Sequence, residues 1–336
     1  MPFSVQAENV TEEYNVQENY SAESAAENVS DEKSEVQSYD IETAQTVNQE
    51  DSAAQEPSKE EVQLSLQLVA VEKTDTTTPN LITLDAADQL SGKINVKDNK
   101  IEVTDGEGLI LLSNVKPEDY ADYAIELITT TGWDLTKPVK VGGKTSTDGT
   151  TDISGTEYSF LGLGSENNPY AGTFRLDQGT AATQYSIATS RSLFNALSTK
   201  AKLGTIPFCI SESTPSMQEP LLAGKLKKGE ASGCLTGQIV LRDLNSDKIS
   251  NAVIGGLIGT MEEGTSAALT FENQFTKGLT IRTSSHTGLF CNTMDKNTSL
   301  TAELKKASSA GNIKVEATEA EMDAGGFVGH MEQVPA

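Results

Sequence analysis

A short glycine-rich segment recurs along the C-terminal half of this sequence. Gly255-Gly-Leu-Ile-Gly-Thr-Met-Glu262 and Gly325-Gly-Phe-Val-Gly-His-Met-Glu332 are the clearest copies, and Thr287-Gly-Leu-Phe-Cys-Asn-Thr-Met294 is a degraded copy between them. Residues 222–229 follow the same pattern, and residues 192–197 give a fainter fifth copy. A unit of this length cannot bury its apolar residues alone, so the repeat predicts copies that stack into a solenoid.

One bulky residue marks the same position in each copy. Successive anchors are 29, 35, 32 and 38 residues apart. We expect these side chains to point inward and form one interior column. The glycines would permit sharp bends and a close approach between coils. The anchors and their glycines are Leu193, Leu222, Gly224, Gly256, Leu257, Gly259, Gly288, Leu289, Gly326, Phe327 and Gly329.

The segments inside each repeat favour strands over helices. Residues 234–241, 267–271, 279–283 and 313–315 are short apolar and β-branched runs, broken by Gly, Asn, Ser and Asp. Paired amphipathic helices, which helical repeats of this length require, are not evident. The sequence therefore predicts a mainly β protein in which residues 190–336 form a parallel β-helix with two or three strands per coil.

The preceding residues predict a different local structure. Residues 62–103 are expected to form N-terminal β-strands, and residues 104–189 a cap and the approach to the solenoid. In the cap, residues 105–115 predict a short helix that Asp105 caps and that ends before Pro117. Residues 142–155 read as a loop. The individual strands are expected at residues 62–71, 81–84, 93–96, 100–103, 123–129 and 139–141.

Negative charge is concentrated at the N-terminus. The chain has 336 residues and a formal net charge of −24, and residues 1–60 contain fifteen acidic and two basic residues. Low hydrophobicity with high net charge predicts that residues 1–61 are a disordered acidic segment. Such a chain would be repelled by nucleic acid and by anionic membranes, and no run of 18 apolar residues predicts a membrane span.

The two ends of the chain suggest processing and continuation. Val5-Gln6-Ala7 fits the small-x-Ala pattern of a signal-peptidase site, so residues 1–7 are interpreted as the remnant of a secretory signal peptide. An ordinary cytosolic N-terminus is the alternative. The chain stops directly after a repeat, and an uncapped solenoid end exposes strand edges. We therefore expect further coils in the parent protein.

Catalytic motifs are not found in the sequence. It contains no His-Glu-x-x-His, no Gly-x-Ser-x-Gly and no phosphate-binding loop, so we predict no catalytic residue, no cofactor and no enzymatic activity. His286 and His330 have no Cys or carboxylate at ligand spacing, and we expect solvated side chains rather than metal ligands. Paired carboxylates contributed by different coils would not form a motif in the sequence.

Two segments have some character of a calcium loop. Asp243-Leu-Asn-Ser-Asp247 begins like one, but Lys248 occupies the glycine position and Ile254 the position of the bidentate glutamate. Residues 148–157 are a weaker candidate. We predict no metal site in either segment.

The three cysteines cannot all pair with one another. A disulfide between Cys209 and Cys234 is one alternative, and buried free thiols are the favoured one, because Cys behaves as a small apolar residue. Alignment of the copies assigns Cys291 to the position of Gly259 and Gly329.

Several of these motifs resemble a known family. Gly-Gly-Leu-Ile-Gly and Gly-Gly-Phe-Val-Gly resemble GLUG-type repeats, which occur in large bacterial surface proteins, adhesins and the N-terminal parts of some IgA-cleaving metallopeptidases. Residues 160–174 resemble the segment that commonly precedes such repeats, although Arg175-Leu-Asp replaces the usual Asp-Gly. Residues 104–136 are similar to the helix-and-strand cap of those proteins. The resemblance implies a right-handed parallel β-helix with an N-terminal α/β cap.

These expectations favour a non-enzymatic, secreted or cell-surface bacterial module. It would serve as an adhesive or structural stalk, as part of a larger surface protein such as a protease or adhesin. Its partner would be an unknown extracellular ligand, such as a host or cell-wall glycan or protein. A carbohydrate-binding or carbohydrate-active β-helix is the alternative, but most aromatic residues beyond position 190 occupy core-like positions.

Overall fold

The computed structural model describes residues 81–128, 132–140, 156–176, 186–210, 216–229, 233–242, 249, 251–318 and 322–332. The acidic segment 1–61, the strand predicted over residues 62–71, the loop 142–155 and the start of the calcium-like loop at residues 243–247 lie outside them. In the described residues, the predicted parallel β-solenoid is confirmed.

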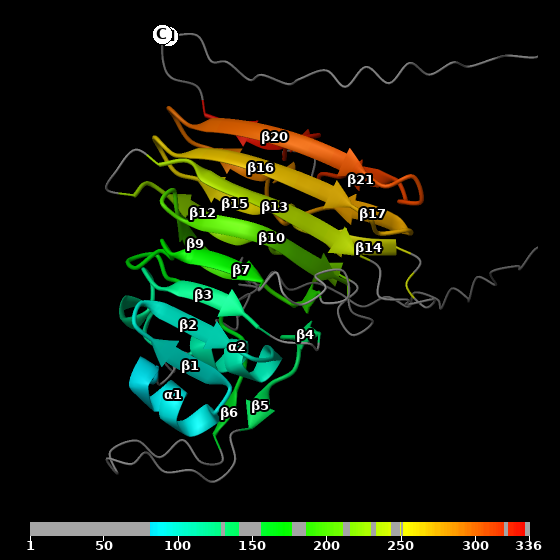
Figure 1. Cartoon of the computed structure of the whole chain (residues 1–336). Coiled ribbons are helices and arrows are strands. Elements are labelled where there is room, and N and C mark those ends of the chain that lie inside the picture. Colours follow the sequence, from blue (N-terminus) through cyan, green and yellow to red (C-terminus); the bar gives the residue numbers. More distant parts are fainter. Residues whose placement is uncertain are drawn as a thin grey trace, which may run out of the picture. The chain divides into compact units, whose positions relative to one another are not determined.

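Four coils follow one another, and a fifth begins (Figure 1). Each complete coil has a short strand, a strand of eight residues and a second short strand. The first coil contains β9 (Phe194–Ser198), β10 (Lys202–Cys209) and β11 (Ser216–Met217). The second contains β12 (Ala223–Lys227), β13 (Leu235–Arg242) and β14 (Asn251–Ile254). The third contains β15 (Ile258–Met261), β16 (Ser266–Asn273) and β17 (Gly278–Ile281). The fourth contains β18 (Thr287–Gly288), β19 (Cys291–Met294), β20 (Ser299–Lys306) and β21 (Ile313–Val315), and β22 (Ala324–Gly325) and β23 (Val328–Met331) begin the fifth.

Equivalent strands of successive coils pair in parallel and form three sheets. The orders are β9-β12-β15-β19-β23, β10-β13-β16-β20 and β11-β14-β17-β21. The long strands lie side by side across one face of the stack (Figure 1). Each predicted strand of the repeats overlaps an observed one, because apolar alternation fixes which residues face the interior.

The interior is built from columns of apolar side chains. Ile206, Ile239 and Phe271 are register partners on β10, β13 and β16, and each is fully buried. On β16, buried and half-buried residues alternate along all eight positions. One face of each long strand therefore packs inside the solenoid while the other faces solvent.

An α/β segment lies at the N-terminal end of the stack. It comprises α1 (Leu84–Ser91), β1 (Ile94–Lys97), β2 (Lys100–Val103), α2 (Gly106–Ser113) and η1 (Pro117–Asp119). β1 and β2 form an antiparallel hairpin, and β2 pairs in parallel with β3 (Ala124–Leu127). The sheet continues through β7 (Thr173–Leu176) to β10, so the cap and the coils share one sheet.

The predicted cap helix is confirmed as α2. The Asp105 side chain accepts a hydrogen bond from the Gly108 N–H at 3.0 Å, which satisfies one free donor of the first turn. The strand predicted over residues 81–84 is wrong. Ile82 forms only an isolated bridge with Val115, and α1 begins at Leu84, because the Thr83 hydroxyl caps it by accepting from the Ala86 N–H.

The segment before the first coil packs beneath it. Leu163 and Tyr170 form bridges with Phe194 and Leu197 of β9, and the rings of Tyr170 and Phe194 stack with centroids 5.3 Å apart. Two further strand pairs complete the region. β4 (Trp133–Asp134) pairs with β8 (Ile187–Ala188), and β5 (Val139–Lys140) pairs with β6 (Glu157–Tyr158).

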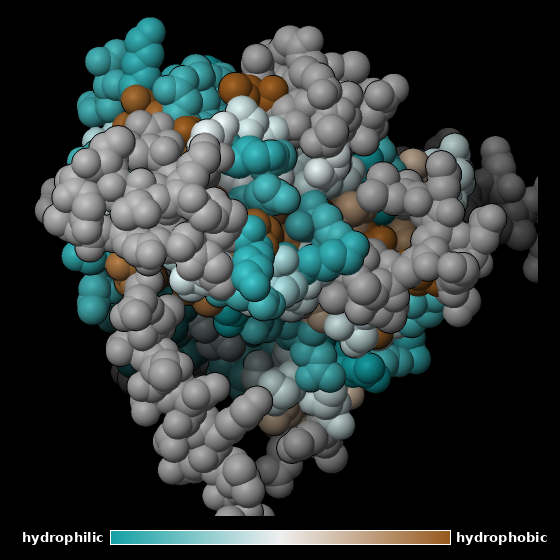
Figure 2. Space-filling model, turned by 90° about the horizontal axis from the view of Figure 1, so that it is seen from below, coloured by the Kyte–Doolittle hydropathy of each residue, from teal (hydrophilic) through white to brown (hydrophobic). Residues whose placement is uncertain are grey.

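The described surface at the end that carries α1 and β1 is mostly hydrophilic, with small separate hydrophobic areas (Figure 2). Among the described helices, none is long and apolar enough to cross a membrane.

The three cysteines are free, with Cys209 and Cys291 buried and Cys234 exposed, so the Cys209–Cys234 disulfide does not form. Burial raises the pKa of the Cys209 and Cys291 thiols to about 12.

Candidate functional site

The predicted anchors occupy the interior, with one exception at the end of the stack. Leu193, Leu222, Leu257 and Leu289 are at most 2% exposed. Phe327 remains 46% exposed, and its ring stacks on Phe290 with centroids 5.3 Å apart. The prediction that Phe327 is an interior residue is therefore wrong in the described residues, because no further coil covers it there.

The degraded copy at residues 287–294 is displaced by one residue from its predicted alignment. The register Ile258↔Cys291↔Val328 makes Phe290, rather than Leu289, the equivalent of Leu257 and Phe327. It also pairs Cys291 with Ile258 and Val328, so the prediction that Cys291 occupies the position of Gly259 and Gly329 is wrong. A degraded copy has too few identical residues to fix an alignment to one position.

Asn292 takes the place of the repeat glycine in that copy. Its amide donates to the Gly255 carbonyl at 3.0 Å and accepts from the Gly288 N–H at 3.1 Å. Asn292 is 4% exposed, so both bonds lie inside the protein. A polar side chain is tolerated here because its amide satisfies two main-chain groups of adjacent coils.

The repeat glycines play two different roles. Gly256 has a φ of +82°, a conformation that disfavours any side chain. A Cβ at Gly259 would lie 2.4 Å from the Gly224 carbonyl oxygen, so the adjacent coils approach too closely for alanine. Gly224 and Gly329 occupy the equivalent position in β12 and β23, and Gly288 lies in β18. Gly326 has no atom within 4 Å of a Cβ, so close packing does not explain it.

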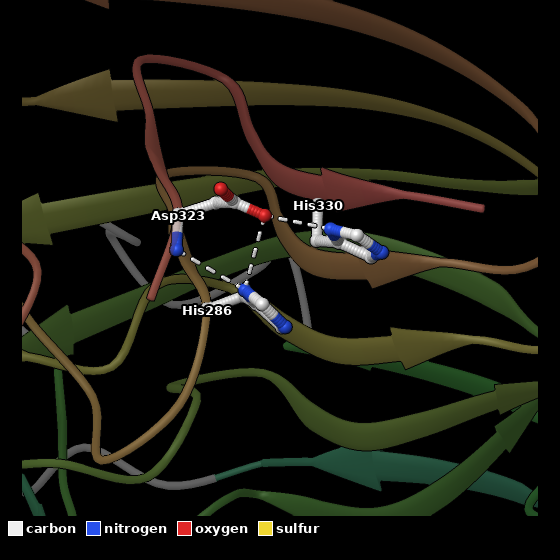
Figure 3. Close-up of side chains that lie close together, drawn as sticks. All are labelled: His286, Asp323 and His330. Atoms are coloured by element: carbon white, nitrogen blue, oxygen red, sulfur yellow. Dashed lines mark hydrogen bonds and ion pairs between the residues drawn. The ribbon is translucent and has the colours of Figure 1, made fainter. Parts of the chain in front are cut away.

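The chain's only two histidines come together on the outer surface, 44 residues apart in sequence. The rings of His286 and His330 stack with centroids 4.4 Å apart (Figure 3). Asp323 lies beside both, with its Oδ2 2.7 Å from His330 Nδ1 and 3.3 Å from His286 Nδ1. Sequence spacing indicated no carboxylate partner, because Asp323 approaches His286 only through coil stacking.

Coil register sets two members of this cluster side by side. Thr287 pairs with Ala324 in the β18–β22 ladder, so His286 and Asp323 precede equivalent positions of adjacent coils. The Asp323 main-chain N–H donates to His286 Nδ1 at 3.2 Å, and the Thr287 N–H donates to the Asp323 carbonyl at 2.9 Å. The backbone of one coil therefore holds both residues against the next.

Buried threonines shape the turn that carries His286. The Thr283 hydroxyl lies 3.1 Å from the His286 carbonyl oxygen and 3.1 Å from the Thr287 hydroxyl. Both threonines are at most 4% exposed. Thr318 of the following coil donates to the Thr283 carbonyl at 2.9 Å. The turn is thus fixed from the interior and from the next coil, while the imidazole points outward.

A comparison of the copies contains one signal for this cluster. His330 occupies the position of Thr260 in β15 and Thr293 in β19. The two earlier coils have Lys225 and Ala196 at this position, so the histidine departs from a threonine that only the two nearest coils share. No comparison between copies singles out Asp323, because residues 319–321 shortly before it lie outside the described part of the chain.

The chemistry of the cluster suits binding more than proton transfer to a substrate. Two imidazoles and a carboxylate are ligands of Zn²⁺ and related ions. One ligand atom from each side chain lies within 4.8 Å of the other two. The side chains of His286, His330 and Asp323 are 33%, 39% and 56% exposed, so an ion would reach them from solvent.

Carboxylates also line up across coils at a second place. Glu262, Asp295 and Glu332 directly follow β15, β19 and β23, and main-chain bonds join each residue to the preceding coil. Partial burial and then the neighbouring charges of Glu332, Glu262 and Glu263 raise the pKa of Asp295. This column of like charges therefore opposes the stacking of adjacent coils.

Comparison with known proteins finds no family model, no curated protein and no solved structure that matches the chain.

Proposed function

We propose that this chain is a non-enzymatic module of a secreted or cell-surface bacterial protein, in which GLUG-type repeats build a structural or adhesive stalk. The observation that carries the proposal is the unbroken stack of in-register strands, in three sheets, from the first coil to the last described one. Each coil adds about 4.8 Å along the stack, the spacing of hydrogen-bonded strands. Such a stack gives a stiff spacer.

The solvent face of the long strands supports the same role. Thr205 and Gln238, Gln238 and Glu272, and Thr270 and Glu303 form hydrogen bonds between adjacent coils at 3.0–3.2 Å. These polar ladders keep the exposed face hydrated while they tie neighbouring coils together. A regular polar face of this kind suits an extended module that works in water.

Surface labelling of the source cells tests the proposed location. Antibodies raised against the full chain should label intact cells, and an added protease should remove the signal. A cytosolic marker, stained in parallel, should appear only after permeabilisation. Labelling of the chain that also requires permeabilisation would contradict the proposal.

A glycan array probed with the full chain separates the stalk from the carbohydrate-binding alternative. We expect no saturable binding, because five of the six aromatic residues beyond position 190 are at most 1% exposed. Phe327 alone of these six offers an exposed ring. Saturable binding to one sugar class, abolished by Phe327→Ala, would favour the carbohydrate-binding alternative instead.

A further inference from the structure

We propose that His286, Asp323 and His330 form a binding site for one divalent transition-metal ion of the Zn²⁺ type, which fastens the last described coil to the coil before it. The ligands would be one nitrogen of each imidazole and a carboxylate oxygen of Asp323. This inference stands independently of the stalk function, because it rests on the geometry of the cluster alone.

The arrangement of donors requires rotation of side chains to accept an ion. Tetrahedral Zn²⁺ with bonds of about 2.0–2.1 Å places its ligand atoms about 3.3 Å apart. Asp323 Oδ2 already lies 3.3 Å from His286 Nδ1 and 2.7 Å from His330 Nδ1. Both Nδ1 atoms face the carboxylate (Figure 3). One nitrogen of each imidazole lies within 4.8 Å of the other, so rotation of these part-exposed side chains would have to bring the two nitrogens up to about 1.5 Å closer.

The hydrogen bonds within the cluster show which contacts a bound ion would replace. His330 Nδ1 and Asp323 Oδ2 share a short hydrogen bond, and His286 Nδ1 accepts from the Asp323 N–H. An ion at His330 Nδ1 would take the place of the hydrogen shared with Asp323 Oδ2, and the neutral imidazole would carry its hydrogen on Nε2 instead. At His286 the ion would take the Nδ1 lone pair that accepts the main-chain bond. Histidines bind metal ions as neutral imidazoles. Water completes the coordination.

The position of the site explains why an ion would matter. His286 belongs to the turn before β18, whereas Asp323 directly precedes β22 and His330 lies in β23, both in the next coil. In the described residues, β23 pairs only with β19, and its residues are half-buried or exposed. An ion held by both coils would close a loop of 37 residues between His286 and Asp323 and so resist detachment of β22 and β23.

Calorimetric titration of the full chain with Zn²⁺ tests the site. The protein should carry no polyhistidine tag, so that its two imidazoles are the only ones present. We expect one tight site, and about a tenfold or greater loss of affinity in His330→Thr and in Asp323→Asn. His330→Thr restores the residue found at Thr260 and Thr293, so it should fold normally. Cys234→Ser, which removes an exposed thiol elsewhere, should leave the affinity unchanged.

Two further measurements make the test independent of the variants. Nuclear magnetic resonance should show both imidazole side chains shifting at one equivalent of Zn²⁺, and neither shifting with the same amount of Mg²⁺, which prefers oxygen ligands. Hydrogen exchange at β19 and β23 should slow when Zn²⁺ is added, while exchange at β10 stays the same. Imidazole signals that do not move, or an affinity unchanged in His330→Thr, would overturn the proposal.

Discussion

Individual side chains contribute to this fold according to how many coils cover them. Leu257 lies between neighbours on both sides and is fully buried, whereas Phe327 contacts Phe290 on one side and is 46% exposed. Both residues occupy the same position of the repeat. The difference in their exposure therefore follows from their places in the stack.

Truncation of these two anchors to alanine should change the free energy of unfolding by different amounts. Leu257→Ala should lower the free energy of unfolding by about 2–5 kcal/mol, because it leaves a cavity among buried neighbours. Phe327→Ala should cost less, about 1–2 kcal/mol, because the ring is 46% exposed and loses only partial burial together with its stacking on Phe290. Chemical denaturation of both variants measures the difference. Equal losses would show that the two positions are equally covered.

Residue-level patterns predicted the solenoid but not the cluster at His286. Short apolar and β-branched runs predicted the strands β13 and β16, and Asp105 marked the start of α2. The displacement at Phe290 and the meeting of Asp323 with the histidines depend on how one coil lies on the next. The degraded copy at residues 287–294 shares too few residues with the others to show that register, and Asp323 lies in a different coil from His286.

Among the elements, the corner after β15, β19 and β23 brings like charges together. Glu262 has a cationic partner in Lys227, 3.5 Å away, but Asp295 in the following coil has carboxylates on both sides. Partial burial and these neighbours raise the pKa of Asp295 above its ordinary value. The folded state therefore binds the proton of Asp295 more tightly than the unfolded state does.

The variant Asp295→Asn should stabilise the protein at neutral pH. Because the pKa is raised on folding, the charged carboxylate opposes folding above that pKa, and the penalty disappears below the unfolded value of about 3.8. We expect a gain of a few tenths of a kcal/mol at pH 7, since exposed charges are screened, and a smaller gain in 1 M salt. Thermal unfolding at several pH values measures it. Asp122→Asn, at an exposed position in the turn after η1, is the matched control. A gain that persists at pH 3 would contradict an electrostatic origin.

The molecule as a whole behaves as a stack in which each coil touches only its neighbours. The stability of such a stack is close to a sum of coil and interface terms. β16 has strand partners on both sides, β13 and β20, whereas β20 has one partner among the described strands. Opening should therefore begin at the last described coil and progress toward the cap.

Native-state hydrogen exchange should reveal this gradient. We expect amides of β20 to exchange at least about tenfold faster than those of β16, since local opening free energies range from near zero to the global value. Mass spectrometry of peptides that cover residues 266–273 and 299–306 makes the comparison within one sample. Uniform protection of the two peptides would mean that the stack opens as a single cooperative unit.

The long strands keep a constant length while the repeat does not. β10, β13, β16 and β20 each have eight residues, yet the connection to the next strand ranges from four residues after β16 to eight after β13. The variation in repeat length therefore falls outside the long strands, in the connections and the short strands. A peptide grafted into the connection between β20 and β21 would be displayed at a fixed height along the stack, and the strands themselves would not need to be redesigned.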